Sequence, residues 1–219
     1  MTIGEPPDWR RLFSIATSII GQVNRTHPVI DEWSFGGGTA MMLQIDHRDS
    51  HDVDIFLPDA QLLGYLDPAK AALKFDNVPD GYEGDGVKFQ KFAFNGIGEI
   101  DFIVAQGLTS VPYARTSVEN VTVFLETVPE IVAKKIYYRG SSIRPRDIFD
   151  IAAAAESHER ELVDELRHYR RHVDATLSAI AGLNADFVSA AIAQLMIRPT
   201  FKHVAATAMQ RTITVLKMV

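Results

Sequence analysis

The sequence predicts an α/β protein in which a mixed sheet with flanking helices precedes a purely helical domain. Up to about residue 125, short segments with the alternating apolar pattern of strands lie between segments of helical periodicity. From Val128 onward the pattern is helical almost to the end of the chain. This change predicts a first domain over residues 1–125 and a helical domain over residues 126–219. A chain of 219 residues is long enough to bury a substantial core.

Helices and strands are expected to alternate along the first domain. The expected elements are a helix over residues 8–25, a strand over 32–35, a helix over 39–45, a strand over 52–57, an interrupted helix over 59–75, and strands over 87–95, 99–105 and 121–125. Pro6-Pro7 precedes the first helix, and Pro68 must restart the interrupted one. Residues 77–86 are expected to form a loop, and Asn95-Gly96-Ile97-Gly98 a hairpin turn. In the second domain, IVAKKIYY, RDIFDIAAAA, a long charged segment near 158–181 and two later segments predict helices.

Composition is typical of a soluble cytoplasmic protein and excludes several kinds of site. The chain is 47% hydrophobic and 23% charged, with a mean hydropathy of 0.00. No apolar run approaches the roughly 20 residues that span a bilayer, and the N-terminus lacks the apolar segment of a secretory signal. The absence of cysteine rules out disulfides and thiolate zinc sites. The cytoplasm is therefore the expected location, without contact with a membrane.

The net charge of −6 argues against a protein that coats nucleic acid by bulk electrostatics. Residues 1–125 carry 9 Lys and Arg against 17 Asp and Glu, whereas residues 126–219 carry 13 against 11. The acidic half suits divalent metals, and the mildly basic half suits a triphosphate or RNA. On charge alone, a solvated surface with uneven charge is the favoured interpretation.

The most informative segment is FGGGTAMMLQIDHRDSHDVDIF, from Phe35 to Phe56. The glycine turn at residues 36–38 lets a phosphate approach the backbone, and the helix that follows supplies free N–H groups and a positive dipole end. Asp52 and Asp54 lie two apart in a strand, so their side chains leave the same face. Two such carboxylates repel each other unless a cation lies between them, and oxygen ligation suits Mg²⁺. The segment therefore predicts a nucleotidyl-transfer site.

A third carboxylate comes from the segment Glu99-Ile100-Asp101-Phe102-Ile103. On a neighbouring strand, Asp101 is placed to ligate a second metal and to take the proton from an incoming hydroxyl. Glu99 is its rival, because the alternation puts both acids on one face. An exposed strand face that carries acids for solubility alone is the alternative.

Residues 47–51 lead into the metal strand and carry further polar groups. Arg48 is a candidate to clamp phosphate oxygens, or it pairs with Asp49 or Asp52. Ser50 is a candidate to cap the backbone or to hydrogen-bond a phosphate. His47 and His51 stand four apart, but a zinc site is rejected because no third ligand is evident.

Two basic clusters follow in the helical domain. Lys135 is expected near the sheet edge as a point charge for the triphosphate, and Arg146-Asp147-x-x-Asp150 opens the next helix. The alternative is that Asp147 caps this helix and Arg146 pairs with it. Residues 167–172 (RHYRRH) form the densest basic run. RNA contact is one interpretation of this run, but a salt-bridged helix surface is favoured, since acids at 159, 161, 164 and 165 precede it.

Together these motifs resemble a known family. GGTA followed by HRDSHDVDIF, then EIDFIVA, VPEIVAKKIYYR and RPRDIFDIAAAA, resembles the AbiEii/AbiGii-type abortive-infection nucleotidyltransferase toxins of the DNA polymerase β-like superfamily. The resemblance runs from about Trp33 to Ala155. It implies a polymerase β-like nucleotidyltransferase core that transfers a nucleoside monophosphate from an NTP to an acceptor hydroxyl. The resemblance also implies that the transfer depends on Mg²⁺, or on Mn²⁺ in its place, and that it releases pyrophosphate.

Residue chemistry and the resemblance together assign the site. Asp52, Asp54 and Asp101 are the expected metal ligands and, with Lys135, the expected catalytic residues. The nucleotide contacts are assigned to Gly37, Gly38, Thr39, Arg48, Ser50, Lys135, Arg146 and Asp147. Gly38 departs from the family pattern, where many members have Ser, so Thr39 must supply that hydroxyl or the contact is absent. The resemblance further implies a cognate antitoxin and, as in some relatives, an RNA acceptor such as a tRNA 3′ end.

Three other functions stay open at this stage. A small-molecule nucleotidyltransferase, for example one that modifies an antibiotic, shares the motifs because fold does not fix the acceptor. A glycosyltransferase would use the Asp-x-Asp pair for a nucleotide-sugar, but it needs a larger nucleotide-binding domain. A catalytically inactive nucleotide-binding relative would keep the fold, although all three acids are present.

Overall fold

The computed structural model describes residues 8–219, which divide into two compact units. Unit 1 contains the described residues up to Ala40 together with Ser50–Gln106 and Tyr113–Glu126. Unit 2 contains Met41–Asp49, Gly107–Pro112 and Thr127–Val219. The predicted fold class, an α/β sheet part followed by a helical C-terminal part, is confirmed. Pro6-Pro7, expected to precede the first helix, lies outside the described residues.

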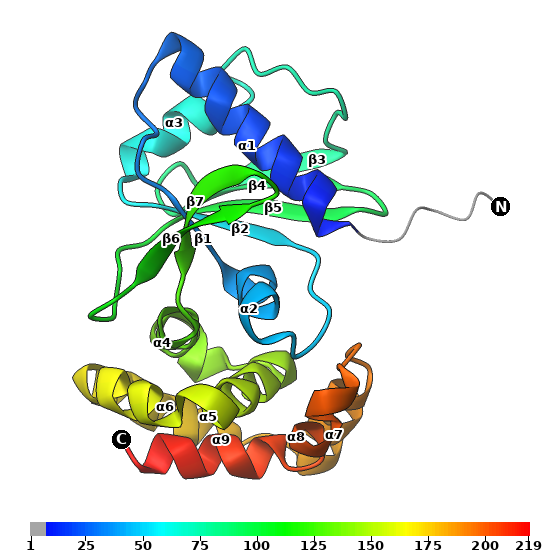
Figure 1. Ribbon diagram of the computed structural model, residues 1–219, viewed down its shortest axis with the longest axis vertical. Coiled ribbons are helices and arrows are strands. Elements are labelled where there is room, and N and C mark those ends of the chain that lie inside the picture. Colours follow the sequence, from blue (N-terminus) through cyan, green and yellow to red (C-terminus); the bar gives the residue numbers. More distant parts are fainter. Residues whose placement is uncertain (1–7) are drawn as a thin grey trace, which may run out of the picture. The chain divides into compact units, whose positions relative to one another are not determined.

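Unit 1 is built on a seven-stranded mixed sheet with the strand order β3-β4-β5-β2-β1-β7-β6 (Figure 1). The strands are β1 (Ser34–Gly36), β2 (Val53–Leu57), β3 (Gly81–Gly84), β4 (Phe89–Phe94), β5 (Gly98–Val104), β6 (Tyr113–Val118) and β7 (Val121–Glu126). β2 pairs with β5 in parallel, as β1 does with β7, and the other pairs are antiparallel. The two carboxylate-bearing strands are therefore direct neighbours.

Helix α1 (Trp9–Thr26) covers part of this sheet, lying against β2 and β5 (Figure 1). Asp8 caps it, since the Asp8 side chain accepts a hydrogen bond from the Arg10 N–H. The apolar residues of one helical face are buried, as the periodicity predicted. Helix α2 (Gly37–Ile45) begins in unit 1 at the glycine turn, and its last residues belong to unit 2.

Unit 1 differs from the expected elements in three places. The helix expected over 59–75 consists only of a 3₁₀ turn, η1 (Ala60–Leu62), and α3 (Leu63–Leu66), and no helix restarts after Pro68. β3 lies inside the predicted loop at 77–86, because pairing with β4 orders it despite its Gly and acidic residues. β6 was not predicted at all. Its first five residues are exposed, so it lacks the apolar alternation of a half-buried strand.

Unit 2 is helical. Its helices are α4 (Val128–Arg139), α5 (Pro145–Leu166), α6 (Arg170–Ala181), α7 (Ala185–Ala193), α8 (Lys202–Ala205) and α9 (Ala208–Lys217), with 3₁₀ turns η2 (Gly140–Ser142), η3 (Arg167–Tyr169) and η4 (Pro199–Phe201). α5 is the central helix and contacts α4, α7, α8 and α9 (Figure 1). No single helix in the described part of the chain is long and apolar enough to cross a membrane.

The long charged helix expected near 158–181 is also wrong. α5 runs from Pro145 through a kink at His158, where φ is −127° and ψ is 18°, and it ends at Leu166. The turn η3 then separates α5 from α6. The apolar RDIFDIAAAA segment, with Ala152–Ala154 completely buried, and the charged segment after it therefore form two helical stretches that meet at the His158 kink.

Candidate active site

Two of the predicted carboxylates face each other in unit 1. The parallel pairing of β2 with β5 sets Asp54 directly opposite Asp101. The flanking residues Val53, Ile55 and Ile100 are completely buried, whereas the two acids lie on the half-exposed face of the sheet. The alternation seen in the sequence therefore places both carboxylates on one face of adjacent strands.

Electrostatics sets Asp101 apart from an ordinary surface acid. Burial raises the pKa of Asp101 to about 7, and the nearby Asp54 carboxylate adds to the rise. Lys91 on β4 opposes this shift, with its Nζ 3.4 Å from Asp101 Oδ2. A carboxyl group with a pKa near 7 exchanges its proton at neutral pH, which a general base must do.

Glu99, the rival of Asp101, is in a different environment. Its side chain is 43% exposed, against 19% for that of Asp101, and it forms an ion pair with Lys91. The Asp101 pKa responds to Asp54 more than to Glu99. The geometry therefore favours Asp101 over Glu99 as the partner of Asp54.

The glycine turn lies directly against this pair. Gly36 at the end of β1 is the antiparallel partner of Asp54, and Gly37 begins α2 with a φ of +69°. A Cβ on Gly37 would lie 1.8 Å from Asp54 Oδ2. Gly37 is therefore required both for its backbone conformation and for the space that the carboxylate occupies. Gly38 follows in the first turn of α2.

Asp52 and Thr39 are tied to the backbone around the pair. The Thr39 hydroxyl donates to the Asp52 carbonyl oxygen at 2.5 Å, and Asp52 Oδ1 accepts from the Glu99 N–H at 3.1 Å. Ser50 lies half-buried in the loop before β2. Among residues 8–219 no group of three or more His, Cys, Asp or Glu side chains is arranged to hold a metal ion. The structure thus brings Asp54 and Asp101 together and holds Asp52 next to them on a backbone N–H.

The donor set still fits a hard divalent cation. Asp54 and Asp101 offer carboxylate oxygens, which Mg²⁺ and Mn²⁺ prefer. The raised pKa of Asp101 reflects, after burial, an excess of negative charge that a cation would relieve. Asp54 and Asp101 are therefore the pair in unit 1 that could hold the metal, whereas the Asp52 carboxylate is bound to the Glu99 N–H and forms no three-carboxylate group with them among residues 8–219.

The sequence interpretation missed two polar residues next to the site. Lys91 was not assigned a role, although the hairpin register between β4 and β5 pairs it with Asp101. Glu126 is buried at the end of β7, where its Oε1 accepts a hydrogen bond from the Ser34 hydroxyl at 2.8 Å. The one sequence feature that could have indicated Glu126 is its position at the end of the apolar run VTVFLE.

A buried ionic network in unit 2 contains three of the other predicted site residues, Arg48, Lys135 and Asp147. Arg48 binds Asp150 through two hydrogen bonds, Nε to Oδ1 at 2.7 Å and Nη2 to Oδ2 at 2.9 Å. Lys135 Nζ lies 2.7 Å from Asp147 Oδ1 and 2.9 Å from Asp150 Oδ2. His47 Nε2 completes the set at 3.0 Å from Asp150 Oδ1. Arg48 thus binds the Asp150 carboxylate, and its Nη1 also donates to the Asp49 carbonyl oxygen at 2.9 Å.

Charges of opposite sign keep this network ionised. Burial opposes ionisation of Asp150, but Lys135 and Arg48 hold its pKa well below the usual value. Burial likewise opposes ionisation of Asp147, whose pKa is lowered by Lys135 and Arg139. Asp147 also accepts from the Arg144 N–H at 3.4 Å, as the capping alternative required.

Arg146 does not join the network. Its side chain is exposed, and it forms no ion pair with any residue of the described chain, Asp147 included. The basic residues of this segment thus divide into Lys135, which is buried and paired, and Arg146, which is open to solvent.

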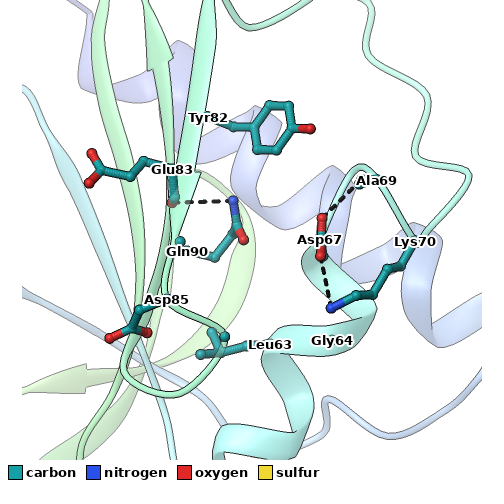
Figure 2. Close-up of a pocket in the computed structure, with 11 residues that line it drawn as sticks. Leu63, Gly64, Asp67, Ala69, Lys70, Tyr82, Glu83, Asp85 and Gln90 are labelled. Carbon is teal, nitrogen blue, oxygen red and sulfur yellow. Dashed lines mark hydrogen bonds and ion pairs between the residues drawn. The ribbon is translucent and has the colours of Figure 1, made fainter.

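A separate hollow of about 550 Å³ lies elsewhere in unit 1, between the α3 region and β3 (Figure 2). Asp67 accepts hydrogen bonds there from the Ala69 N–H and Lys70 Nζ, and Gln90 Nε2 donates to the Glu83 carbonyl oxygen. No predicted site residue lines this hollow. It therefore adds nothing to the carboxylate pair.

Comparison with known proteins agrees with these observations. Residues 23–213 match the family model described as nucleotidyl transferase AbiEii toxin, Type IV TA system. This chain belongs to the AbiEii toxin family. The resemblance inferred from the motifs is thereby confirmed, and the AbiEii protein is a nucleotidyltransferase of the toxin type.

Among solved structures, MenT4 supports the fold. MenT4, a nucleotidyltransferase toxin from Mycobacterium tuberculosis, superposes with a TM-score of 0.53 at 15% identity, covering 95% of this chain and 84% of that one. JHP933 from Helicobacter pylori gives a TM-score of 0.46 at 14% identity, covering 94% and 89%. A comparison with curated proteins finds no match. At 15% identity the likeness to MenT4 shows the fold alone.

Proposed function

We propose that this AbiEii protein transfers a nucleoside monophosphate from an NTP to a hydroxyl at the end of an RNA, with tRNA as the first candidate. The reaction would depend on Mg²⁺ or Mn²⁺ and release pyrophosphate. The observation that carries the proposal is the Asp54–Asp101 pair beside the Gly37 turn. A cognate antitoxin and a cytoplasmic location complete the proposal, because the family is that of a toxin–antitoxin system.

The residues of unit 1 take distinct roles in this proposal. Asp54 and Asp101 would hold the divalent cation, with Asp52 as the further proposed ligand, and the cation would supply charge neutralisation for the triphosphate and the attacking hydroxyl. The Asp101 carboxylate accepts the proton from that hydroxyl, and a bound cation would favour the ionised form of Asp101 that this role requires. The N–H groups at the start of α2, from Gly37 onward, bind phosphate oxygens. Thr39 contributes by fixing the backbone at Asp52.

For the basic residues of unit 2 we propose two roles. Lys135 and Arg48 stabilise the unit, since a contact with triphosphate would take them from buried carboxylates at 2.7–2.9 Å. Arg146 is exposed, and we assign it the role of binding a phosphate group of the substrate.

The test is incubation of the purified protein with each NTP, radiolabelled at the α-phosphate, with and without Mg²⁺. Total RNA, purified tRNA and a set of small molecules that includes antibiotics serve as acceptors. Label should enter RNA, with pyrophosphate released, only when the cation is present. Asp54→Asn should abolish transfer while leaving the fold intact, and Glu99→Gln is the matched control on the same sheet face.

Other outcomes would replace the proposal. Label on a small molecule instead of RNA would identify the small-molecule nucleotidyltransferase. Binding of NTP by calorimetry without transfer to any acceptor would identify an inactive relative. Transfer that is unchanged in Asp54→Asn would refute the assigned site.

A further inference from the structure

Two consecutive glycines of the turn are each covered by a carboxylate. A Cβ on Gly37 would lie 1.8 Å from Asp54 Oδ2, and a Cβ on Gly36 would lie 2.2 Å from Glu126 Oε2. Both distances are well below 3.0 Å, which is about the shortest approach of real Cβ atoms. β1 lies between β2 and β7 in the sheet, so Asp54 flanks the turn from one neighbouring strand and Glu126 flanks it from the other.

Gly36 is required for space and not for its backbone conformation. Its φ lies outside the left-handed region, in contrast to the φ of +69° at Gly37. The groups that exclude a side chain at Gly36 are the Glu126 carboxylate and the Phe56 ring, whose Cε2 would lie 2.6 Å from the added Cβ. A glycine inside a strand often marks such a close approach. Gly36 thus leaves room for the Glu126 carboxylate.

Glu126 lies on the same face of the sheet as Asp54. The parallel pairing of β1 with β7 sets Phe35 opposite Leu125, so the next residues along, Gly36 and Glu126, are neighbours. Glu126 Oε1 accepts a hydrogen bond from the Ser34 hydroxyl, two residues before Gly36 and therefore on the same face of β1. Gly36 is in turn the antiparallel partner of Asp54. Glu126 is only 1% exposed, so it forms the buried end of this row of residues.

We infer that Glu126 is a positioning residue for the proposed metal site. Its carboxylate fills the space beside Gly36, and the hydrogen bond from Ser34 fixes it there. This packing holds the glycine turn against Asp54 and so fixes the direction in which Asp54 presents its oxygens to a divalent cation. Residues behind a metal ligand orient it and thereby set the affinity for the metal. The inference rests on the proposed function in that Asp54 and Asp101 are the metal ligands.

Binding of Mn²⁺ by the full chain tests the inference without NTP or acceptor. The probe is Mn²⁺ alone, and the readout is the electron paramagnetic resonance signal of free Mn²⁺, which decreases as the ion is bound. Glu126→Ala should weaken Mn²⁺ binding about 10- to 100-fold, because it empties the space beside Gly36. Glu126→Gln keeps the shape of the side chain and an acceptor for the Ser34 hydroxyl, so it should bind Mn²⁺ like the unchanged protein.

Gln90 provides a matched control for the loss of a buried polar side chain. It is 5% exposed, and its Nε2 donates to the Glu83 carbonyl oxygen at 3.3 Å. Lys91, the next residue, is the partner of Asp101, so the Gln90 side chain leaves the opposite face of the sheet. Gln90→Ala should therefore lower the urea midpoint, as Glu126→Ala does, without weakening Mn²⁺ binding. Equal losses of Mn²⁺ affinity in the two variants would show a merely structural role and overturn the inference.

A double variant tests the contact between Glu126 and Gly36 directly. Gly36→Ala alone should weaken Mn²⁺ binding, because its methyl group displaces the Glu126 carboxylate. In the Glu126→Ala background this carboxylate is absent, so the combined loss of affinity should be smaller than the product of the two single losses. Losses that multiply would mean that the two residues act independently, which would overturn the inference.

The outcomes separate this inference from the proposed function. If Glu126→Ala weakens Mn²⁺ binding while no RNA accepts label, the inference holds and the proposed acceptor fails. If Glu126→Ala binds Mn²⁺ unchanged while Asp54→Asn binds it weakly, the inference is overturned and the proposed site stands. A loss in Glu126→Gln as large as that in Glu126→Ala would make Glu126 a ligand of the cation and overturn its positioning role. Binding that is unchanged in Asp54→Asn would refute the metal site and the inference together.

Discussion

Each unit of the molecule contains two aspartates that lie close together. The pKa of the aspartate is raised in unit 1 and lowered in unit 2. In unit 1, Asp101 faces Asp54 and its pKa rises to about 7. In unit 2, Asp150 shares its surroundings with Asp147, yet its pKa is lowered well below the usual value. Burial removes water from both carboxyl groups, completely at Asp150 and partly at Asp101, and raises the pKa in each case.

The difference lies in the charge of the neighbours. Asp101 has a like charge beside it and a single lysine whose Nζ is 3.4 Å away. Asp150 has Arg48 and Lys135 within 2.9 Å. Where acidic side chains outnumber the basic side chains beside them, as at Asp101, the carboxylate is suited to bind a metal ion and to exchange a proton. Where basic side chains balance the acidic ones, as at Asp150, the carboxylate is suited to stabilise the fold.

The largest expected effect is on catalysis and concerns Asp101. Asp101→Asn should lower the rate of nucleotide transfer about 10²- to 10⁴-fold, because it removes the general base. Its free energy of unfolding should stay the same or increase, since the repulsion with Asp54 is lost. Transfer assays and urea unfolding check this prediction. Glu99→Gln is the control, and a loss of activity as large as that of Asp101→Asn would assign the base to Glu99.

Asp150 should show the reverse behaviour. Asp150→Asn leaves the buried Lys135 and Arg48 without their shared counter-charge and should lower the free energy of unfolding by about 3–5 kcal/mol. Asp174→Asn removes an exposed ion pair and should cost less than about 1 kcal/mol. Urea unfolding measures both variants. A cost for Asp150→Asn as small as that of the control would show that the network does not stabilise the unit.

This contrast also explains how far the sequence could predict the site. The unit 1 acids were found because strand alternation fixes which side chains share a face, and the glycine turn at Gly37 marks a close approach of the backbone. The partners of Arg48 were not found, because Asp150 lies 102 residues away and only tertiary packing brings them together. An exposed strand such as β6 leaves no alternation to detect, so its place in the sheet was missed as well.

A smaller effect is expected from adding a methyl group beside the carboxylate pair. Gly37→Ala places a Cβ in the space of Asp54 Oδ2 at a φ of +69°, so it should cost about 1–3 kcal/mol of stability and also lower transfer. Gly64→Ala is the control, because no atom lies within 4 Å of its added Cβ. That helical substitution should be neutral or stabilise by up to about 1 kcal/mol. Equal stability of the two variants would mean that the glycine turn and Asp54 shift to accommodate the added Cβ without strain.

The pH dependence of stability tests both carboxylates at once. The pKa of Asp101 rises from 3.8 to about 7 on folding, so its contribution to stability is complete below about pH 3.8 and is lost as the pH rises to 7. The pKa of Asp150 falls below 3.8, so its contribution is complete above that value and is lost as the pH falls through the lower folded pKa.

Urea unfolding from pH 3 to 8 should therefore show opposite trends in the two variants. The stability difference between the unchanged protein and Asp101→Asn should decline between about pH 4 and 7, by no more than about 1.4 kcal/mol per pH unit for one proton. The stability difference between the unchanged protein and Asp150→Asn should decrease only below about pH 3.8. Added Mg²⁺ should move the Asp101 decline to lower pH, because a bound cation favours the ionised carboxylate. If Mg²⁺ leaves that decline where it was, Asp101 does not contact the metal, and the charge excess in unit 1 needs another explanation.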